Sequence, residues 1–221
     1  MKITTNTLNI LKNFAKINPS ILLVEGNTLK TISPNKTIMA KAKVDTTFVK
    51  RCAIYNLDRF IATISLFQDP ELNFDEKSVK INGDNKKSDY YYADENTIKA
   101  PPDKEIKLPS VDVSFTLSSD DLDAVMKSAA VLGSPHIAVK SDGAKIVVAQ
   151  LDNKDSSSHS SELEIAEGDG KKYNMVFKTE HLRMIPGSYT VSISFRGIAS
   201  FKHTEKSIQY WIATEAGSTK E

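Results

Sequence analysis

Residues 5–17 read TNTLNILKNFAKI, and their spacing decides how the first part of this chain folds. Leu8, Leu11 and Ala15 recur at helical intervals and predict an amphipathic helix with one buried stripe. The opposite face carries lysines and asparagines and no acid. Pro19 ends the helix, because the residue before a proline disfavours the helical conformation.

The same pattern returns near residue 119. Ser119-Asp120-Asp121 is typical of a helix start, and Gly133 is typical of a helix end. The predicted buried stripe of this helix is Leu122, Val125, Met126 and Ala129, and a shift of 114 residues places the stripe of the first helix on three of these four. This correspondence indicates an internal repeat.

A second correspondence strengthens the repeat. Residues 56–67 predict a helix with Leu57, Phe60, Ile61 and Ile64 inward, and it follows a strand predicted over 49–55. At a shift of 122, Tyr55 and Phe60 fall on Phe177 and Leu182, which again belong to a strand and the helix after it. The order of elements is thus the same in both halves, which predicts two similar domains.

Strands and turns fill the intervals between these helices. Alternation and turn residues predict further strands over 21–25, 29–32, 37–44, 78–81, 88–93 and 161–166, with turns at 26–27, 82–85, 142–143 and a glycine hairpin turn at 168–171. Pro101, Pro102 and Pro109 interrupt helix and sheet alike. We therefore expect a first domain over 1–94, an extended linker over 95–110 and a second domain over 111–221.

Composition narrows the class of protein. The 221 residues are 40% hydrophobic without an apolar run near the roughly 20 residues that span a bilayer, and the first residues lack a signal-peptide pattern, so we expect an intracellular protein with no membrane partner. The net charge of +1 hides a basic beginning, where eight lysines in the first 50 residues face only Glu25 and Asp45. This asymmetry favours nucleic acid as a partner but is also typical of an ordinary solvated surface.

The chemistry of an enzyme is missing from the sequence. His136, His159, His181 and His203 lie far apart, and no spacing among them suits a metal. Cys52 is the single cysteine, and it is predicted as a small core residue within a strand. No motif of a phosphate loop or of a nucleophile elbow is complete. We therefore expect a binding protein that is not an enzyme and that holds neither cofactor nor metal.

Several stretches in order along the chain resemble the sliding clamp of T-even-type tailed phages. They are residues 11–18 (LKNFAKIN), 53–61 (AIYNLDRFI), 184–189 (MIPGSY) and 213–219 (ATEAGST), together with the proline-rich segment 100–109. None is a catalytic motif, and their joint occurrence carries the resemblance.

The resemblance implies a fold and a function. The fold is α+β, with two clamp-type domains that each pack two helices on antiparallel sheet, and three copies close into a homotrimeric ring. The function is that of a DNA polymerase processivity factor, which encircles double-stranded DNA without reading its sequence. The implied partners are the phage DNA polymerase, an ATP-driven clamp loader and host RNA polymerase during late transcription, all in the cytoplasm of the infected bacterium.

The resemblance also implies three sets of site residues. Basic side chains on the helices are placed toward DNA, strands at sheet edges form the subunit interface, and apolar residues of the linker and the last predicted strand border a pocket for a partner peptide. The DNA-facing set is Lys12, Lys16, Arg59, Lys127 and Arg183; the interface set is Tyr90, Tyr91, Tyr92, Glu162 and Glu164; the pocket set is Ile106, Leu108, Trp211 and Ala213.

Each set has an alternative that the sequence leaves open. The cations of the DNA-facing set equally fit ordinary solvated side chains, because the same helices hold as many acids as bases. The tyrosine run also fits packing within one chain, and Trp211 also fits the core. The alternative function is a monomeric or dimeric α+β accessory protein that binds nucleic acid on an open basic surface.

Overall fold

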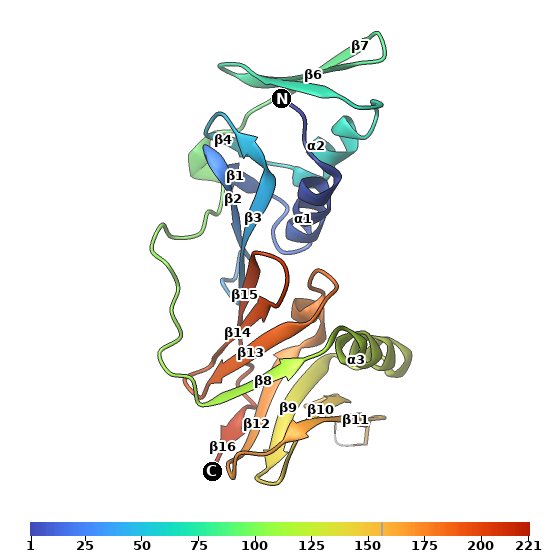
Figure 1. The fold of residues 1–221 in the computed structure, drawn as a ribbon, viewed down its shortest axis with the longest axis vertical. Helices are drawn as coiled ribbons and strands as arrows, with labels where there is room; N and C mark the ends of the chain where they lie inside the picture. The colour runs from blue at the N-terminus through green and yellow to red at the C-terminus, as the bar shows by residue number, and fades with distance from the viewer. Residues whose placement is uncertain (156) are drawn as a thin grey trace. The chain divides into compact units, whose positions relative to one another are not determined.

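The computed structural model describes residues 1–155 and 157–221. The chain forms two compact units, Met1–Lys104 and Glu105–Glu221, shown in Figure 1. Each unit combines helix with antiparallel sheet, as the α+β expectation requires.

The first unit contains two α-helices and three groups of paired strands. Its elements are α1 (Thr5–Ala15), β1 (Ile21–Leu23), β2 (Gly26–Ile32), β3 (Ile38–Phe48), β4 (Cys52–Ile54), α2 (Leu57–Ile64), β5 (Glu71–Phe74), β6 (Ser78–Gly83), β7 (Lys86–Tyr91) and the 3₁₀ turn η1 (Glu95–Thr97). Strand β2 pairs with β3, β1 with β4, and β5, β6 and β7 form a three-stranded sheet.

Helix α1 forms as its apolar spacing predicts. The Thr4 hydroxyl accepts a hydrogen bond from the Thr7 backbone N–H (3.1 Å) and caps the amino end. Leu11 and Phe14 are fully buried, and α1 packs against α2 and β3. The helix ends at Ala15, two residues earlier than predicted.

The strand pairing of the first unit differs from a simple hairpin around Gly26. Strand β1 hydrogen-bonds β4, with Leu22 opposite Ala53, while β2 turns away and pairs with β3. Gly26 adopts a positive φ of 106°, which lets the chain change direction between β1 and β2. Alternation identified the strands but carries no information about their partners.

A hairpin of β6 and β7 packs on α2. The tight turn predicted at residues 82–85 is confirmed, since Asp84 and Asn85 both have positive φ (50° and 58°). The Tyr90 ring meets the Phe60 ring edge-on at 5.1 Å between centroids. Four residues predicted inward on α2 are buried. Strand β5 was missed by the sequence analysis, because only Leu72 of its four residues is buried and no apolar alternation marks it.

The second unit contains one α-helix and two sheets. Its elements are β8 (Val113–Leu117), α3 (Ser119–Leu132), β9 (His136–Asp142), β10 (Lys145–Leu151), β11 (Ser161–Glu167), β12 (Lys172–Lys178), the 3₁₀ turn η2 (Thr179–Leu182), β13 (Tyr189–Ser194), β14 (Ile198–His203), β15 (Ile208–Ala213) and β16 (Thr219–Lys220). The first sheet has the order β11-β10-β9-β12-β16, and β15, β14, β13 and β8 are neighbours in the other.

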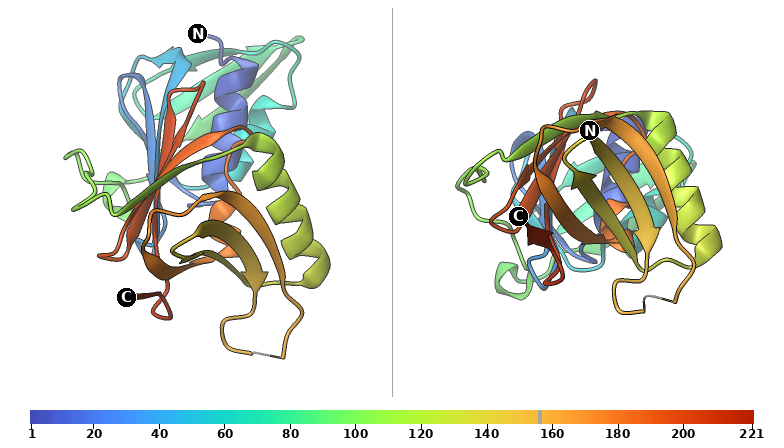
Figure 2. Two further views of the ribbon diagram at one scale, coloured as in Figure 1. Left: turned by 60° about the horizontal axis from the view of Figure 1, so that its bottom comes forward. Right: turned by 90° about the horizontal axis from the view of Figure 1, so that it is seen from below.

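Helix α3 has well-defined ends. Its cap is Ser118, one residue before the predicted start, whose hydroxyl accepts from the Asp121 N–H (3.1 Å). Gly133 ends it in the left-handed conformation (φ 65°), as predicted. The helix lies against β10 and β11 (Figure 2), and Leu122, Val125 and Ala129 are buried. Met126 was predicted as the fourth buried residue, and this was wrong: it is half-buried and lines a surface groove.

The glycine segment 168–171 is a crossover, and its prediction as a hairpin turn was wrong. Strand β11 pairs with β10, whereas β12 pairs with β9, so the segment passes over the β9–β10 turn. The Gly168 N–H donates to the Ala144 carbonyl (2.7 Å), and the Gly170 N–H donates to the Gly143 carbonyl (3.0 Å). Gly168 allows close backbone approach, and Gly170 adopts a positive φ of 82° with open space at its Cβ position. Local sequence does not distinguish these uses of glycine from a turn.

The carboxy-terminal segment also differs from expectation. The sequence analysis ended with the strand that holds Trp211 and Ala213, yet a further strand, β16, adds to the edge of the five-stranded sheet, with Thr219 opposite Asn174. The Ser218 hydroxyl accepts from the Val176 N–H (2.9 Å) and fixes the approach to it.

The internal repeat is visible in the order of elements. Helices α1 and α3 correspond, and α2 corresponds to η2, which follows β12 as α2 follows β4. The fourth helical segment is a short 3₁₀ turn, because only four residues separate β12 from the Arg183 cap.

The close approach of residues 168–171 to the β9–β10 turn gives a stability prediction. A Cβ on Gly168 would lie 2.3 Å from the Gly143 carbonyl oxygen, so we expect Gly168→Ala to lower the free energy of unfolding by about 1–3 kcal/mol, as overpacking does. Gly83→Ala is the matched control, because its Cβ meets nothing nearer than 3.5 Å. Equal urea midpoints for the two variants would contradict the crossover geometry.

Candidate nucleic-acid interface

Helix α1 presents an exposed basic face. Its buried stripe turns Lys12 and Lys16 to solvent, and Asn9 lies exposed on the same helix. No acidic residue occurs between Thr5 and Ala15. These two ammonium groups therefore have no counter-charge from their own helix, as diffuse contact with phosphate requires.

Helix α2 contributes Arg59 beside a structured amino end. The Asn56 side chain caps the helix by accepting from the Arg59 N–H (2.8 Å), and the Tyr90 hydroxyl donates to the Asn56 carbonyl (2.8 Å). Burial raises the pKa of Tyr90, and the nearby Arg59 guanidinium opposes that rise. The Arg59 side chain is exposed next to Asp58, so its positive charge is partly balanced on the same turn.

Helix α3 is a weaker basic surface. Lys127 forms an ion pair with Asp123 (2.5 Å), one turn earlier, and that hydrogen bond raises the pKa of Lys127. The ammonium thus stays protonated but has a carboxylate beside it. Ala130 and Val131 follow on the exposed side, and Val131 is 85% exposed. Lys127 is accordingly less available to phosphate than Lys12 or Lys16.

Arg183 lies at a groove that the sequence analysis did not foresee. The groove, about 810 Å³, runs between the carboxyl end of α3, the loop after β10 and η2. Lys154 and Lys178 join Arg183 in lining it, while Asp152 and Glu180 supply negative charge. Lys178 and Arg183 flank the same short turn η2, whereas Lys154 joins them from the loop after β10 only through the tertiary fold.

Both strands predicted as subunit edges are edges in the structure. Strand β7 is the outer strand of the β5-β6-β7 sheet, and β11 is the outer strand of the five-stranded sheet. On β11, Glu162 and Glu164 pair with Lys140 (3.0 Å) and Lys145 (2.6 Å) of their own unit. An open edge exposes a row of backbone donors and acceptors.

The three consecutive tyrosines of the predicted interface differ in their surroundings. Tyr90 packs on Phe60, and the Tyr92 hydroxyl donates to the Asp75 carbonyl (3.3 Å), so both are partly engaged within the unit. Tyr91 is 71% exposed. The Tyr92 N–H donates to the Lys77 carbonyl (3.0 Å), and because successive N–H groups of a strand point in opposite directions, the Tyr91 N–H points to the open edge.

The residues predicted for a peptide pocket have mixed exposure. Ile106 and Leu108 are half-buried in the segment before β8. Trp211 is 4% exposed on β15, opposite Ser200, and Ala213 ends that strand opposite Ile198. Their assembly into a pocket remains a prediction.

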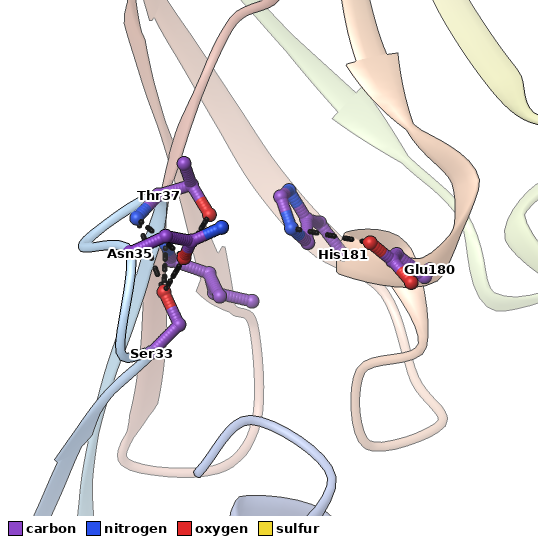
Figure 3. A network of polar contacts seen from close by, with 6 residues as sticks. Ser33, Asn35, Thr37, Glu180 and His181 are labelled. Carbon is purple, nitrogen blue, oxygen red and sulfur yellow. Dashed lines mark hydrogen bonds and ion pairs between the residues drawn. The ribbon is translucent and has the colours of Figure 1, made fainter.

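Two polar clusters were not singled out from the sequence (Figure 3). In the β2–β3 turn, the Ser33 hydroxyl donates to Asn35 Oδ1 (2.7 Å), and the Thr37 hydroxyl donates to the same oxygen (2.8 Å). In η2, His181 Nε2 lies 3.9 Å from Glu180 Oε1. Burial lowers the pKa of His181, so its ring is neutral at pH 7.

Reactive and metal-binding groups do not gather in the part of the chain that is described. Cys52 is buried, and this burial raises the pKa of its thiol to about 12, which disfavours the nucleophilic thiolate. Within residues 1–155 and 157–221, no group of three or more His, Cys, Asp or Glu side chains suits a metal ion. Nor do the helices of those ranges include one of sufficient length and hydrophobicity to span a membrane.

Comparison with protein families defines the class. The model described as "DNA polymerase processivity factor" matches residues 3–100, and the model described as "gp45 sliding clamp, C terminal" matches residues 114–216. Together the two models match most of both halves of the chain.

Two relatives with the description "Sliding clamp" match this chain over nearly its full length. The sliding clamp of Vibrio phage KVP40 is 32% identical over 98% of this chain and all of that protein, and that of Escherichia phage RB69 is 29% identical over 99% of each. This chain belongs to the sliding-clamp family of DNA polymerase processivity factors.

Among solved structures, the fold resembles two clamps with bound peptides. One is A. fulgidus PCNA bound to the C-terminal region of FEN-1 (TM-score 0.67, 14% identity, 94% of each chain). The other is the Helicobacter pylori beta clamp bound to a DNA ligase peptide (TM-score 0.72, 14% identity), where 98% of this chain covers 65% of that longer chain. At this identity the likeness concerns the fold.

Proposed function

We propose that three copies of this chain close into a ring that encircles duplex DNA and tethers the replicative polymerase to its template. The match to clamp relatives over the full length of the chain carries this proposal. The ring acts without catalysis, by holding its partners on DNA. An ATP-driven clamp loader opens it, and in late transcription it tethers host RNA polymerase, in the cytoplasm of the infected cell.

The open sheet edges support the closed ring. Strands β7 and β11 are edges of different sheets, so β7 of one copy and β11 of the next can pair and leave neither edge free. Such contacts join two different surfaces, and they close into a ring when the rotation from one copy to the next is one full turn divided by a whole number. A solution mass of one or two chains would instead favour the accessory protein with an open basic surface.

The first prediction of this proposal concerns the β7 edge. We expect native protein at about three times 24.4 kDa and Tyr91→Pro at a lower mass, because proline removes the N–H that points to the open edge. Tyr91→Phe keeps that N–H and the ring, and is expected to retain the native mass. Light scattering checks both, and an unchanged mass for Tyr91→Pro would exclude β7 from the interface.

The second prediction concerns topology. Lys12, Lys16 and Arg59 give few phosphate contacts, so direct affinity for linear DNA is expected to be weak and to fall with salt. A ring loaded on nicked circular DNA is expected to survive a moderate salt wash and to leave after linearisation. Gel filtration of labelled protein with the DNA measures this retention. Equal retention on circular and linear DNA argues against encirclement.

The third prediction concerns the partner pocket at Ile106, Leu108, Trp211 and Ala213. Two proteins of the same fold bind partner peptides, which supports such a pocket here. Leu108 is half-buried, so we expect Leu108→Ala to leave the oligomer and its melting temperature nearly unchanged and to weaken binding of the polymerase's terminal peptide by about 1–3 kcal/mol. Titration calorimetry measures the affinity.

A matched control separates the pocket from general effects. Leu66 is 68% exposed after α2, outside the proposed pocket, so Leu66→Ala is expected to bind the peptide as native protein does. Unchanged peptide affinity in a folded Leu108→Ala oligomer would show that Leu108 does not line the peptide pocket.

A further inference from the structure

Two exposed apolar side chains lie on helical elements beside the two open sheet edges. Val131 of α3 is more exposed than any other large hydrophobic side chain among residues 1–155 and 157–221, and Tyr55, just before α2, is 65% exposed. Covering such side chains removes apolar surface from water and is favourable. Their places relative to β7 and β11 indicate what covers them.

Tyr55 belongs to the end of β7 that carries Tyr91. An antiparallel bridge joins Ala53 to Ala93, so the chain that leaves β4 and the chain that leads from β7 run alongside each other. The Tyr90 hydroxyl donates to the backbone carbonyl of the residue after Tyr55 (2.8 Å). Tyr55 and Tyr91 are thus two exposed aromatic side chains at one end of the open β7 edge.

Val131 lies on the flank of α3 toward the open β11 edge. Met126 and Ala130 line the groove that α3 forms with η2, and Val131 is about 140° round the helix axis from Met126. Strands β11 and β12 are on opposite sides of β9 and β10, and η2 continues from β12. The flank away from the groove is therefore the β11 side of the helix.

The end of α3 that carries Val131 lies at the beginning of β11. Asp152 and Lys154, which follow β10, line the groove together with Gly133 at the end of α3. Near the end of β10, Gln150 is opposite Ser161, the first residue of β11. Helix α3 and strand β11 thus run in opposite directions, with the end of one beside the start of the other.

The charges of the two edges favour an antiparallel pairing of β7 with β11 of the next copy. Strand β7 begins with Lys86 and Lys87, and β11 ends with Glu167; all three are exposed, and they form no ion pair within the two described ranges. The other acids of these strands each have a lysine in their own sheet. Antiparallel pairing brings the two lysines to Glu167, whereas parallel pairing brings them to Ser161.

The same antiparallel pairing brings the Tyr55 end of β7 to the Val131 end of α3. We infer that Tyr55 of one copy packs on Val131 of the next copy, so that an apolar contact between the α2 and α3 regions accompanies the paired strands. The inference rests on the proposed ring and adds to it two residues outside the strands that fix how copies join. The occupant of this surface is a second copy of the chain, because the unpaired charges at the other end of the two edges are complementary.

The test measures the dissociation of the full-length trimer by sedimentation velocity over a dilution series. We expect Val131→Asp to raise the trimer dissociation constant at least about tenfold, because it sets a carboxylate against the Tyr55 ring. Ala130→Asp is the matched control: it adds the same charge one residue away, on the flank that lines the groove, and is expected to dissociate as native protein does.

A second pair of variants tests direct contact. Tyr55→Lys alone is expected to weaken the trimer, since it removes the aromatic ring. Combined with Val131→Asp in one chain, it sets a lysine of one copy beside an aspartate of the next, and the trimer is expected to dissociate at least about tenfold less readily than with Val131→Asp alone. Both positions are exposed, so the melting temperatures of the dissociated single chains are expected to stay near that of native protein.

The outcomes separate this inference from the ring itself. A native trimer in which Val131→Asp and Ala130→Asp dissociate alike overturns the inference and leaves the ring standing. Two weakened single variants without recovery in the double variant overturn direct contact between Tyr55 and Val131. Native protein with the mass of one or two chains overturns the proposed ring, and the inference with it.

Discussion

Burial of one apolar stripe from each long helix is the constraint on which the rest of the structure depends. Leu11 and Phe14 of α1, and Leu122 and Val125 of α3, lie within the core of their units. Because a helix has two sides, burial of one fixes which side chains face solvent. Lys12 and Lys16 are exposed as a direct consequence, so the stripe that stabilises the first unit also displays its cations.

The sheets impose a second constraint of a different kind. Hydrogen bonds satisfy the interior strands, while β7 and β11 keep open edges. Monomeric proteins protect such edges, whereas a ring uses them, since each copy completes the edge of the next. The Tyr91 N–H, which is directed away from β6, is one backbone donor on such an open edge. The proposed ring thus follows from the same backbone chemistry that builds each unit.

Charge is distributed so that the two units differ. In α1 the lysines have no acid on their own helix, whereas Lys127 in α3 has Asp123 one turn away. On the opposite side of the first unit, Lys30 and Lys41 face each other across β2 and β3. Weak, diffuse attraction suits a protein that slides, because strong contacts at any one point would hold it still. The proposed function leaves strong attachment to an apolar pocket, where a few anchors can supply the affinity.

Sequence alone determined the helices α1, α2 and α3, most strands, and the turns at residues 82–85 and 142–143. These features depend on neighbours along the chain: apolar spacing in α1, and a left-handed glycine after α3. The resemblance to phage clamps then supplied the family, which the relatives confirm.

Only the tertiary structure decided which strands pair and which side chains converge. The pairing of β1 with β4 and the crossover at Gly168 depend on contacts with strands distant in sequence, which alternation does not encode. Lys154 lines the same groove as Lys178 and Arg183, the two caps of η2, for the same reason. Local patterns fix how a segment folds, whereas long-range packing fixes what it touches.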